Sequence, residues 1–314
     1  MFASLFVVLP IFALVFAGWA ARRLGALGDT ATREVNRLVV YLALPALLFD
    51  IMANADPAEL WRPGFIAAFA LGCAIVFAGT LAVRMVGGRK LADATLESLN
   101  ASYANTGFMG FPLILAVLGE SGLVPTLVAT ILTVSVLFGI AIILIEFGRQ
   151  TGARRRDIWR KTALALITNP LLVAPILGAL LMASGLALPS PVQSFLDLLG
   201  AAASPCALIA LGLFLARTPE AGEGNQTGLV ATLTALKLIA QPAATWLVAG
   251  PLLGLPPATV HLVVLLAALP TGTGPFMLAE LYGRGGVVTS RVVLLTTVLS
   301  VVTLSAYLMV MPAG

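Results

Sequence analysis

The chain has 314 residues, of which 60% are hydrophobic and only 10% are charged, and its formal net charge is +4. A soluble globular protein is roughly half apolar and about a quarter charged. This composition therefore excludes a soluble globular protein and indicates a chain in a lipid bilayer. The positive charge does not indicate nucleic-acid binding, because the basic residues lie in short segments between apolar runs. Two scattered cysteines, Cys73 and Cys206, and one histidine cannot form a structural zinc site, so no metal and no cofactor are expected.

Ten apolar runs are long enough to cross a bilayer, for which about 20 residues are needed. They cover residues 4–21, 35–53, 64–83, 94–118, 123–146, 162–184, 192–216, 228–250, 258–281 and 287–310. The first run is not expected to be a cleavable signal peptide, because its basic pair, Arg22 and Arg23, follows the run instead of preceding it. The expected fold class is an all-α membrane protein with ten transmembrane helices.

Lysine and arginine are concentrated in alternate loops. Of the 18 basic residues, all but Arg62 and Lys237 lie in one set of loops. That set contains Arg22, Arg23, Arg33, Arg37, Arg84, Arg89, Lys90, Arg149, Arg154, Arg155, Arg156, Arg160, Lys161, Arg217, Arg284 and Arg291. By the positive-inside rule these loops are cytoplasmic, which places both termini on the extracytoplasmic side of the cell inner (plasma) membrane.

The chain divides into two halves of five spans each. The expected units are a first repeat, a basic cytoplasmic linker and a second repeat, at residues 1–148, 149–161 and 162–314. The linker is expected to orient the chain, with a patch for lipid headgroups as the alternative. Because five is an odd number, the second half enters the membrane upside-down, and prolines recur 160 residues apart (Pro45, Pro205) and 163 apart (Pro112, Pro275). This pattern predicts an inverted repeat, with which transporters build alternating access around a midplane site.

The fourth and ninth runs are interrupted by glycine, proline and hydroxyl residues, in ANTGFMGFP (104–112) and LPTGTGPF (269–276). A helix cannot run unbroken through them, and in lipid the freed backbone groups must be satisfied by protein or a watery cavity. The N-terminal ends of the outgoing half-helices, with Pro112 and Pro275 in their first turns, would form an anion site. A kink used only for packing is the alternative. The candidate binding residues here are Asn105, Thr106, Gly107, Gly110, Pro112, Thr271, Gly272, Thr273 and Pro275.

Lys237 lies about nine residues into the eighth run, and Gln241 follows one turn later on the same face. Both are candidate binding residues, because an ionisable group inside a membrane is costly and therefore functional by default. The Lys237 ammonium could pair with an anionic substrate, or lie against the C-termini of the half-helices where another carrier would bind Na⁺. The alternative is a side chain that snorkels towards the cytoplasm.

Neither break contains a carboxylate, which argues against a Na⁺ site made of acidic ligands there. The carboxylates near the ends of the runs are Asp50, Asp197, Glu97, Glu146 and Glu280. They are expected to be interfacial or helix-end charges instead of proton carriers. His261, close to the membrane surface, is expected to have no role in the site.

Several stretches resemble the auxin efflux carrier family. They are ANTGFMGFPL (104–113), ALPTGTGPFMLAELYG (268–283), TNP (168–170), ALIALGLFLA (207–216) and VNRLVVYLALPALLF (35–49). The resemblance covers essentially all ten spans and implies a fold similar to sodium/proton antiporters and bile acid symporters, with spans 4 and 9 crossing. It also implies a scaffold of spans 1, 2, 6 and 7, a mobile transport domain of spans 3–5 and 8–10, and a homodimer.

The same resemblance implies roles for individual residues. Asn105 matches the asparagine at the family's first crossing, which is similar to a carboxylate-binding residue, and Lys237 matches a basic position ahead of a proline in span 8. Pro112 and Pro275 match the crossing prolines. Ala104 replaces the proline of the plant exporters, and the central linker is short, so a bacterial-type permease for malonate, malate or similar acids is favoured over an auxin carrier.

The function expected from the sequence is secondary transport of a small organic anion, a mono- or dicarboxylate, by rocking of the crossed-helix domain. No GxxxxGK[ST] motif is present, so ATP would have to come from another chain, and proton-motive force, membrane potential or a Na⁺ gradient remain as drivers. The chain is not expected to be an enzyme, because it has one peripheral histidine and no paired carboxylates at the midplane. A positive Lys237 in place of a metal ion favours Na⁺-independent transport. The rivals are a cation or proton exchanger or sodium-coupled symporter of the same fold, an intramembrane enzyme, and a sensor of similar build.

Overall fold

The computed structural model describes residues 2–28, 30–148, 164, 168, 170–216 and 226–310. In these ranges every regular element is a helix, and the only β-type pairing is one isolated bridge. This confirms the prediction of an all-helical chain. The basic linker predicted at 149–161, the beginning of the sixth run and Arg217 lie outside the described residues.

The helices of the first half follow the predicted apolar runs. They are α1 (Phe2–Arg23), α2 (Ala31–Leu38), η1 (Val39–Ala43), α3 (Leu44–Ala53), α4 (Pro57–Leu60), α5 (Pro63–Val86), α6 (Leu91–Ser102), η2 (Thr106–Gly110), α7 (Phe111–Leu118), η3 (Glu120–Gly122), α8 (Leu123–Ile131), η4 (Leu132–Leu137) and α9 (Phe138–Gly148). The segments η1, η2 and η4 are π-helical, and η3 is a short 3₁₀ turn.

The second half has a similar succession of helices. They are α11 (Pro170–Ser184), α12 (Ser190–Ala201), α13 (Ala203–Leu215), α14 (Thr227–Ala235), η5 (Leu236–Ala240), α15 (Gln241–Leu247), η6 (Val248–Leu252), α16 (Pro257–Ala267), α17 (Gly274–Tyr282) and α18 (Gly286–Val310). Here η5 and η6 are π-helical.

Five helices of the described part are long and apolar enough to cross a membrane by length and composition. They are Ala31–Ala53, Pro63–Val86, Glu120–Gly148, Ser190–Leu215 and Gly286–Val310. Three shorter apolar helices are Thr106–Leu118, Pro170–Ser184 and Pro257–Ala267, and the first and last of them belong to the interrupted fourth and ninth runs. An all-helical chain with several candidate membrane spans is therefore confirmed, while the inverted repeat of ten spans and the side of the termini stay predictions.

Several prolines inside the apolar helices lie just after π-helical segments, with one residue between. Pro45 follows η1, Pro112 follows η2 and Pro242 follows η5, each as the second residue of the next α-helix. Proline has no N–H to donate and its ring clashes with the carbonyl four residues earlier. A π turn is wider than an α turn, so it relieves this clash while the helix continues.

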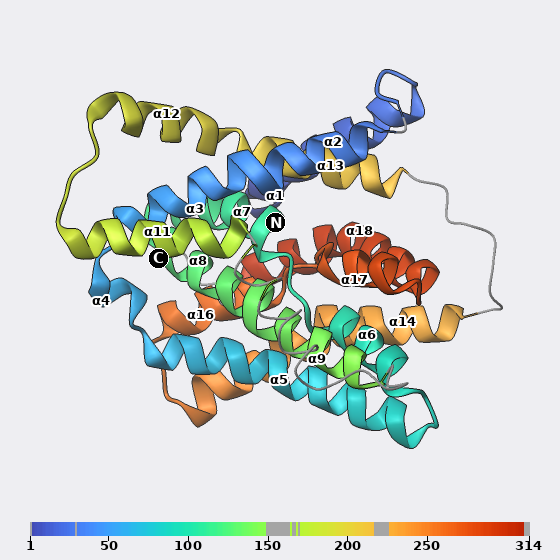
Figure 1. Cartoon of the computed structure of the whole chain (residues 1–314). Coiled ribbons are helices and arrows are strands. Elements are labelled where there is room, and N and C mark those ends of the chain that lie inside the picture. Colours follow the sequence, from blue (N-terminus) through green and yellow to red (C-terminus); the bar gives the residue numbers. More distant parts are fainter. Residues whose placement is uncertain are drawn as a thin grey trace.

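The helices form two groups (Figure 1). In the first group α3 packs against α11 and α12, and α1 packs against α13; this group lies along the top of the view. In the second group α5 packs against α6 and α15, α6 against α9, and α14 against α18, below the first group. The helices α7 and α8 contact the first group through α1 and α3. The division into a scaffold of spans 1, 2, 6 and 7 and a mobile transport domain stays a prediction.

Candidate functional site

The interruptions of the fourth and ninth runs lie against each other. Ala104 in the first break and Thr271 in the second form the isolated antiparallel β-bridge. The hydrogen bonds of this pair are Asn105 N–H to the Pro270 carbonyl at 2.9 Å and Gly272 N–H to the Tyr103 carbonyl at 3.0 Å. Each break therefore satisfies part of the other's freed backbone, as a non-helical segment inside a membrane protein requires.

Two glycines allow the breaks to approach closely. A Cβ on Gly272 would lie 3.0 Å from Tyr103 Cε1, and a Cβ on Gly274 would lie 2.5 Å from Tyr103 Cζ. The Tyr103 ring is buried and packs at an angle to the Phe138 ring, with centroids 6.2 Å apart, so it has little freedom to move aside. The glycines of the TGTG sequence thus make room for Tyr103 in addition to interrupting the helix.

Asn105 and Thr106 lie at the start of the helix that leaves the first break. The helix begins with η2, and the Asn105 carbonyl accepts hydrogen bonds from the N–H groups of Met109 and Gly110, both at 3.1 Å. The side chains are buried, yet Asn105 Nδ2 and Thr106 Oγ1 have no hydrogen-bond partner among the described residues. A buried polar group left unpaired costs about 1–3 kcal/mol, so both atoms are suited to meet a ligand or a water molecule.

The structure corrects the placement of Pro112. It is the second residue of α7, but α7 continues directly from η2, so the outgoing helix begins at Thr106 and Pro112 lies beyond its first turn. The π turn explains the difference, because it lets the helix start before the proline. Pro275 does lie in a first turn, as the second residue of α17.

The remaining predicted residues of the breaks have mainly backbone roles. Gly107 and Gly110 lie within η2, and a Cβ on Gly110 would come within 3.2 Å of Thr126 Cγ2. The Thr273 carbonyl accepts the Met277 N–H at 3.0 Å, which starts the first turn of α17. Among the described residues, these positions shape the backbone of the site, and the structure shows no side-chain hydrogen bond from them.

Thr271 connects the second break to α6 and α18. Its Oγ1 donates to the Asn100 carbonyl at 2.8 Å, and its N–H donates to Thr296 Oγ1 at 3.1 Å. Asn100 Nδ2 in turn donates to Thr289 Oγ1 at 2.9 Å. Sequence reasoning missed Asn100, Thr289 and Thr296. A polar residue inside an apolar run was the available signal, and Asn100 carried it most clearly.

Replacing Thr271 with valine should destabilise the protein by about 1 kcal/mol, because it removes the hydroxyl that donates to the Asn100 carbonyl while keeping the shape of the side chain. Thermal unfolding of the purified protein checks this. Thr232→Val is the matched control, since the Thr232 hydroxyl bonds only within its own helix, to the Gly228 carbonyl, on an exposed face. An equal effect of the two variants would contradict a special role for Thr271.

Lys237 is fully buried in η5, and its Nζ donates to the Ala267 carbonyl at 2.8 Å. Ala267 is the last residue of α16, where the unpaired carbonyls carry partial negative charge. The side chain does not reach the surface in this structure, so the snorkelling alternative is not observed. The ammonium lies at a half-helix C-terminus, one of the two functional arrangements considered from the sequence.

The helices that lead into the two breaks are α6 and α16. Gln241 lies at the C-terminal end of α6, as Lys237 lies at the C-terminal end of α16. Gln241 is fully buried, and its Nε2 donates to the carbonyl of Ser102, the last residue of α6, at 2.8 Å. The same nitrogen lies 3.2 Å from Cys73 Sγ. One turn of the eighth run therefore places a donor on the negative end of each incoming half-helix. The positive N-terminal ends at η2 and α17 are left facing the breaks, an arrangement that suits an anion.

Four of the carboxylates considered above lie outside both breaks and have side-chain partners; the Glu280 side chain lies outside the described part. The contacts are Glu97 with Arg84 and Arg89, Glu146 with the Tyr282 hydroxyl at 2.9 Å, and Asp50 and Asp197 with Gln193 Nε2 at 2.7 and 2.8 Å. His261 Nδ1 lies 3.1 Å from the Tyr307 hydroxyl. No group of three or more metal-ligating side chains occurs among the residues that the structure describes.

The family model described as "Membrane transport protein" matches residues 4–308, nearly the whole chain. The chain belongs to the membrane transport protein family. Membership confirms the resemblance to the auxin efflux carriers and makes the chain a membrane protein. The family and its relatives are transporters and not enzymes, so the intramembrane-enzyme alternative is set aside.

Relatives of this membrane transport protein come from bacteria, archaea and plants. A protein of Rhizobium meliloti (strain 1021) named "Putative malonate transporter" is 30% identical over 308 residues, covering 98% of this chain and 95% of the relative. An uncharacterized transporter of Methanocaldococcus jannaschii is 25% identical over 312 residues, covering 96% of each chain. A protein of Oryza sativa subsp. japonica named "Probable auxin efflux carrier component 5c" is 27% identical over 327 residues, covering 87% of each chain.

Proposed function

We propose that this membrane transport protein is a secondary transporter of a small carboxylate and that the paired breaks bind the carboxylate group. One observation carries the proposal. Lys237 and Gln241 cover the negative ends of α16 and α6, while Asn105 Nδ2 is buried beside the start of η2 with no partner in the described part of the chain. A carboxylate placed there would accept from the Asn105 amide and lie in the positive field of the helix N-terminus.

The substrate class follows from the site and from one relative. The R. meliloti relative is named for malonate, and similarity over almost the whole of both chains supports a dicarboxylate of that size. Ala104, which takes the position of the plant exporters' proline, favours the same class over auxin.

The proposed mechanism is alternating access in the inner membrane. Ten spans in an inverted repeat, with both termini extracytoplasmic, would place the breaks at the midplane, where the two halves cross. The helix group formed by α1, α2–α3, α11 and α12–α13 would be the scaffold, also holding the homodimer together, and the other group would carry the substrate past it.

The proposed transport is independent of Na⁺. The Lys237 ammonium contacts the carbonyl at the end of α16, a position where a carrier with a metal site would place its cation. Neither break contains a carboxylate. A sodium-coupled symporter or a cation exchanger of the same fold is therefore less well supported.

Replacing Asn105 with alanine should raise the KM for malonate about tenfold or more in proteoliposomes, because a hydrogen bond to a charged group is worth roughly 1.5–3 kcal/mol. Asn105→Asp should be worse than Asn105→Ala, because a carboxylate of the same shape would repel the substrate. Uptake and exchange of radiolabelled malonate, with and without a Na⁺ gradient, measure both effects.

Asn54→Ala is the matched control. Asn54 is an exposed asparagine at the end of α3 whose amide bonds to Asp50, so its loss should leave KM unchanged. Wild-type kinetics in both Asn105 variants would remove Asn105 from the site. Counterflow of labelled substrate through the wild type distinguishes a carrier from a sensor, since only a carrier exchanges substrate.

A further inference from the structure

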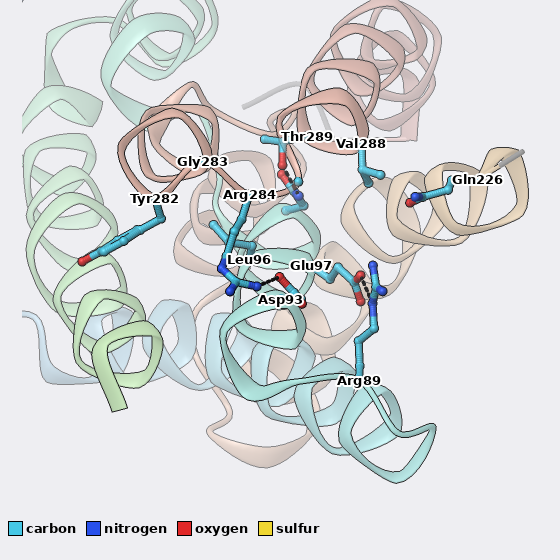
Figure 2. A pocket seen from close by; sticks show the side chains of 12 residues that line it. Arg89, Asp93, Leu96, Glu97, Gln226, Tyr282, Gly283, Arg284, Val288 and Thr289 are labelled. Carbon is cyan, nitrogen blue, oxygen red and sulfur yellow. Dashed lines mark hydrogen bonds and ion pairs between the residues drawn. The ribbon is translucent and has the colours of Figure 1, made fainter. Parts of the chain in front are cut away.

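A cavity of about 640 Å³ lies between α6, the start of α14 and the turn from α17 into α18 (Figure 2). This volume is in the range of sites for small molecules. Its polar and charged lining includes Arg89, Asp93, Glu97, Asn100, Arg284 and Thr289. The cavity is distinct from the pair of breaks, because apart from Asn100 its lining shares no contact with them that the structure shows.

Ion pairs form the walls of this cavity. Arg284 Nη1 donates to Asp93 Oδ1 at 3.0 Å, and Arg89 Nε donates to Glu97 Oε1 at 2.9 Å. Arg84 binds the other oxygen of Glu97. Figure 2 shows Asp93 extending from α6 towards Arg284, and Glu97 towards Arg89. Of the residues that line the cavity, the guanidinium groups of Arg89 and Arg284 meet the carboxylates of Glu97 and Asp93. A ligand that shares or replaces a carboxylate on one of these guanidinium groups would itself be an anion.

Arg284 is held at the cavity by its two neighbours. Gly283 has a φ of 61° and Gly285 a φ of 63°, a left-handed conformation that glycine adopts without strain. The resulting tight turn leads from the short helix α17 directly into α18. The Arg284 side chain remains 37% exposed, so its guanidinium can contact a ligand in the cavity while Asp93 holds one of its nitrogens.

Asn100 links the cavity to the second break. Its carbonyl accepts the Thr271 hydroxyl at 2.8 Å, while its side chain lines the cavity and donates to Thr289. Asn100 Oδ1 is buried and has no partner among the described residues. Asn100 therefore belongs to the cavity lining and also contacts Thr271 of the second break.

We propose that this cavity is a second carboxylate site, in which Arg284 binds the substrate before it reaches the breaks or after it leaves them. The inference rests on the proposed function, because the cavity would serve the same anion. A carboxylate there would accept from the Arg284 guanidinium beside, or in place of, Asp93. The loops of Arg89 and Arg284 are among the basic ones, so the site would face the cytoplasm.

Cysteine protection by malonate tests this site on the full chain in phosphatidylcholine nanodiscs. Gln226 lines the cavity and is only partly buried, so Gln226→Cys with Cys206→Ala provides a thiol for a water-soluble maleimide. Malonate should slow the labelling. Arg284→Gln should raise the malonate concentration that halves the labelling rate by about tenfold, because a charge-assisted hydrogen bond is lost. Asp93→Asn should lower that concentration, because the competing carboxylate is gone.

The controls separate this inference from the proposed function. Arg33→Gln, at an exposed ion pair with Glu34, should leave protection unchanged. Asn105→Ala should raise the KM of transport but keep protection of the cavity thiol. Failure of malonate to protect the thiol, or unchanged protection in Arg284→Gln and Asp93→Asn, would overturn the second site and leave the Asn105 test untouched. If Arg284→Gln does not fold, Asp93→Asn decides alone. Protection by added phosphatidylglycerol but not by malonate would assign the cavity to a lipid phosphate and also overturn the inference.

Discussion

Replacing Lys237 with methionine should lower malonate transport at least tenfold while changing the thermal midpoint by only a few degrees. The ammonium is fully buried and donates to the carbonyl that ends α16. Without it, the negative end of the α16 dipole faces the breaks and opposes the entry of an anion. An electrostatic effect of about 1.4 kcal/mol already corresponds to a tenfold loss.

The expected stability of Lys237→Met follows from two opposing terms. The variant loses a hydrogen bond to the Ala267 carbonyl, which costs roughly 1–3 kcal/mol. It also removes a buried charge, and replacing a buried ionic group by an apolar side chain of similar volume is often neutral or stabilising. Methionine is preferred to alanine for this test because it leaves little cavity behind.

Lys237→Gln is the matched variant, since it keeps a donor and removes the charge. If the charge is decisive, Lys237→Gln should transport as poorly as Lys237→Met. If the hydrogen bond alone is decisive, it should recover most of the transport. Transport by Lys237→Met at the wild-type rate, measured in proteoliposomes with equal amounts of folded protein, would exclude Lys237 from the proposed mechanism.

Replacing Gly212 with alanine should destabilise the chain by about 3 kcal/mol or prevent its accumulation in the membrane. A Cβ at this position in α13 would lie 1.9 Å from the Val15 carbonyl oxygen of α1 and 2.8 Å from the backbone nitrogen of Trp19 in the same helix. The contact is reciprocal, because a Cβ on Gly18 of α1 would lie 2.2 Å from the Ile209 carbonyl oxygen of α13. Both obstacles are backbone atoms, so the two helices would have to separate, and close packing of small residues is what holds helices together in lipid.

Gly79→Ala in α5 is the control for this prediction. A Cβ there meets nothing within 4 Å, and alanine is the better helix former, so the variant should be neutral or slightly stabilising. Thermal unfolding and the yield of monodisperse protein in detergent measure both variants. Equal stability of Gly212→Ala and Gly79→Ala would mean that α1 and α13 do not pack as closely as the structure shows.

Much of the candidate site was predictable because its residues break a local rule. Gly107, Gly110 and Pro112 pointed to the first break, although the helix runs through them from Thr106 and the non-helical residues are 103–105. Gly272 and Pro275 pointed to the second, and a freed backbone in lipid must be satisfied somewhere. Lys237 was predictable for a similar reason, as a charge in an apolar segment. Asn100 and Thr296 were missed because a single neutral polar residue in a helix has many innocuous explanations, among them a bond to its own backbone.

The sequence by itself determined that the chain is a helical membrane protein, and it located the two regions where helices are interrupted. It could do so because composition, the length of apolar runs and the chemistry of glycine and proline are local properties. Only the tertiary structure decided that Ala104 pairs with Thr271, that the Lys237 ammonium meets the Ala267 carbonyl, and that Arg284 meets Asp93 beside a cavity. The physical reason is that a buried polar group is satisfied by whichever partner packing brings within about 3 Å, and these partners lie far away along the chain.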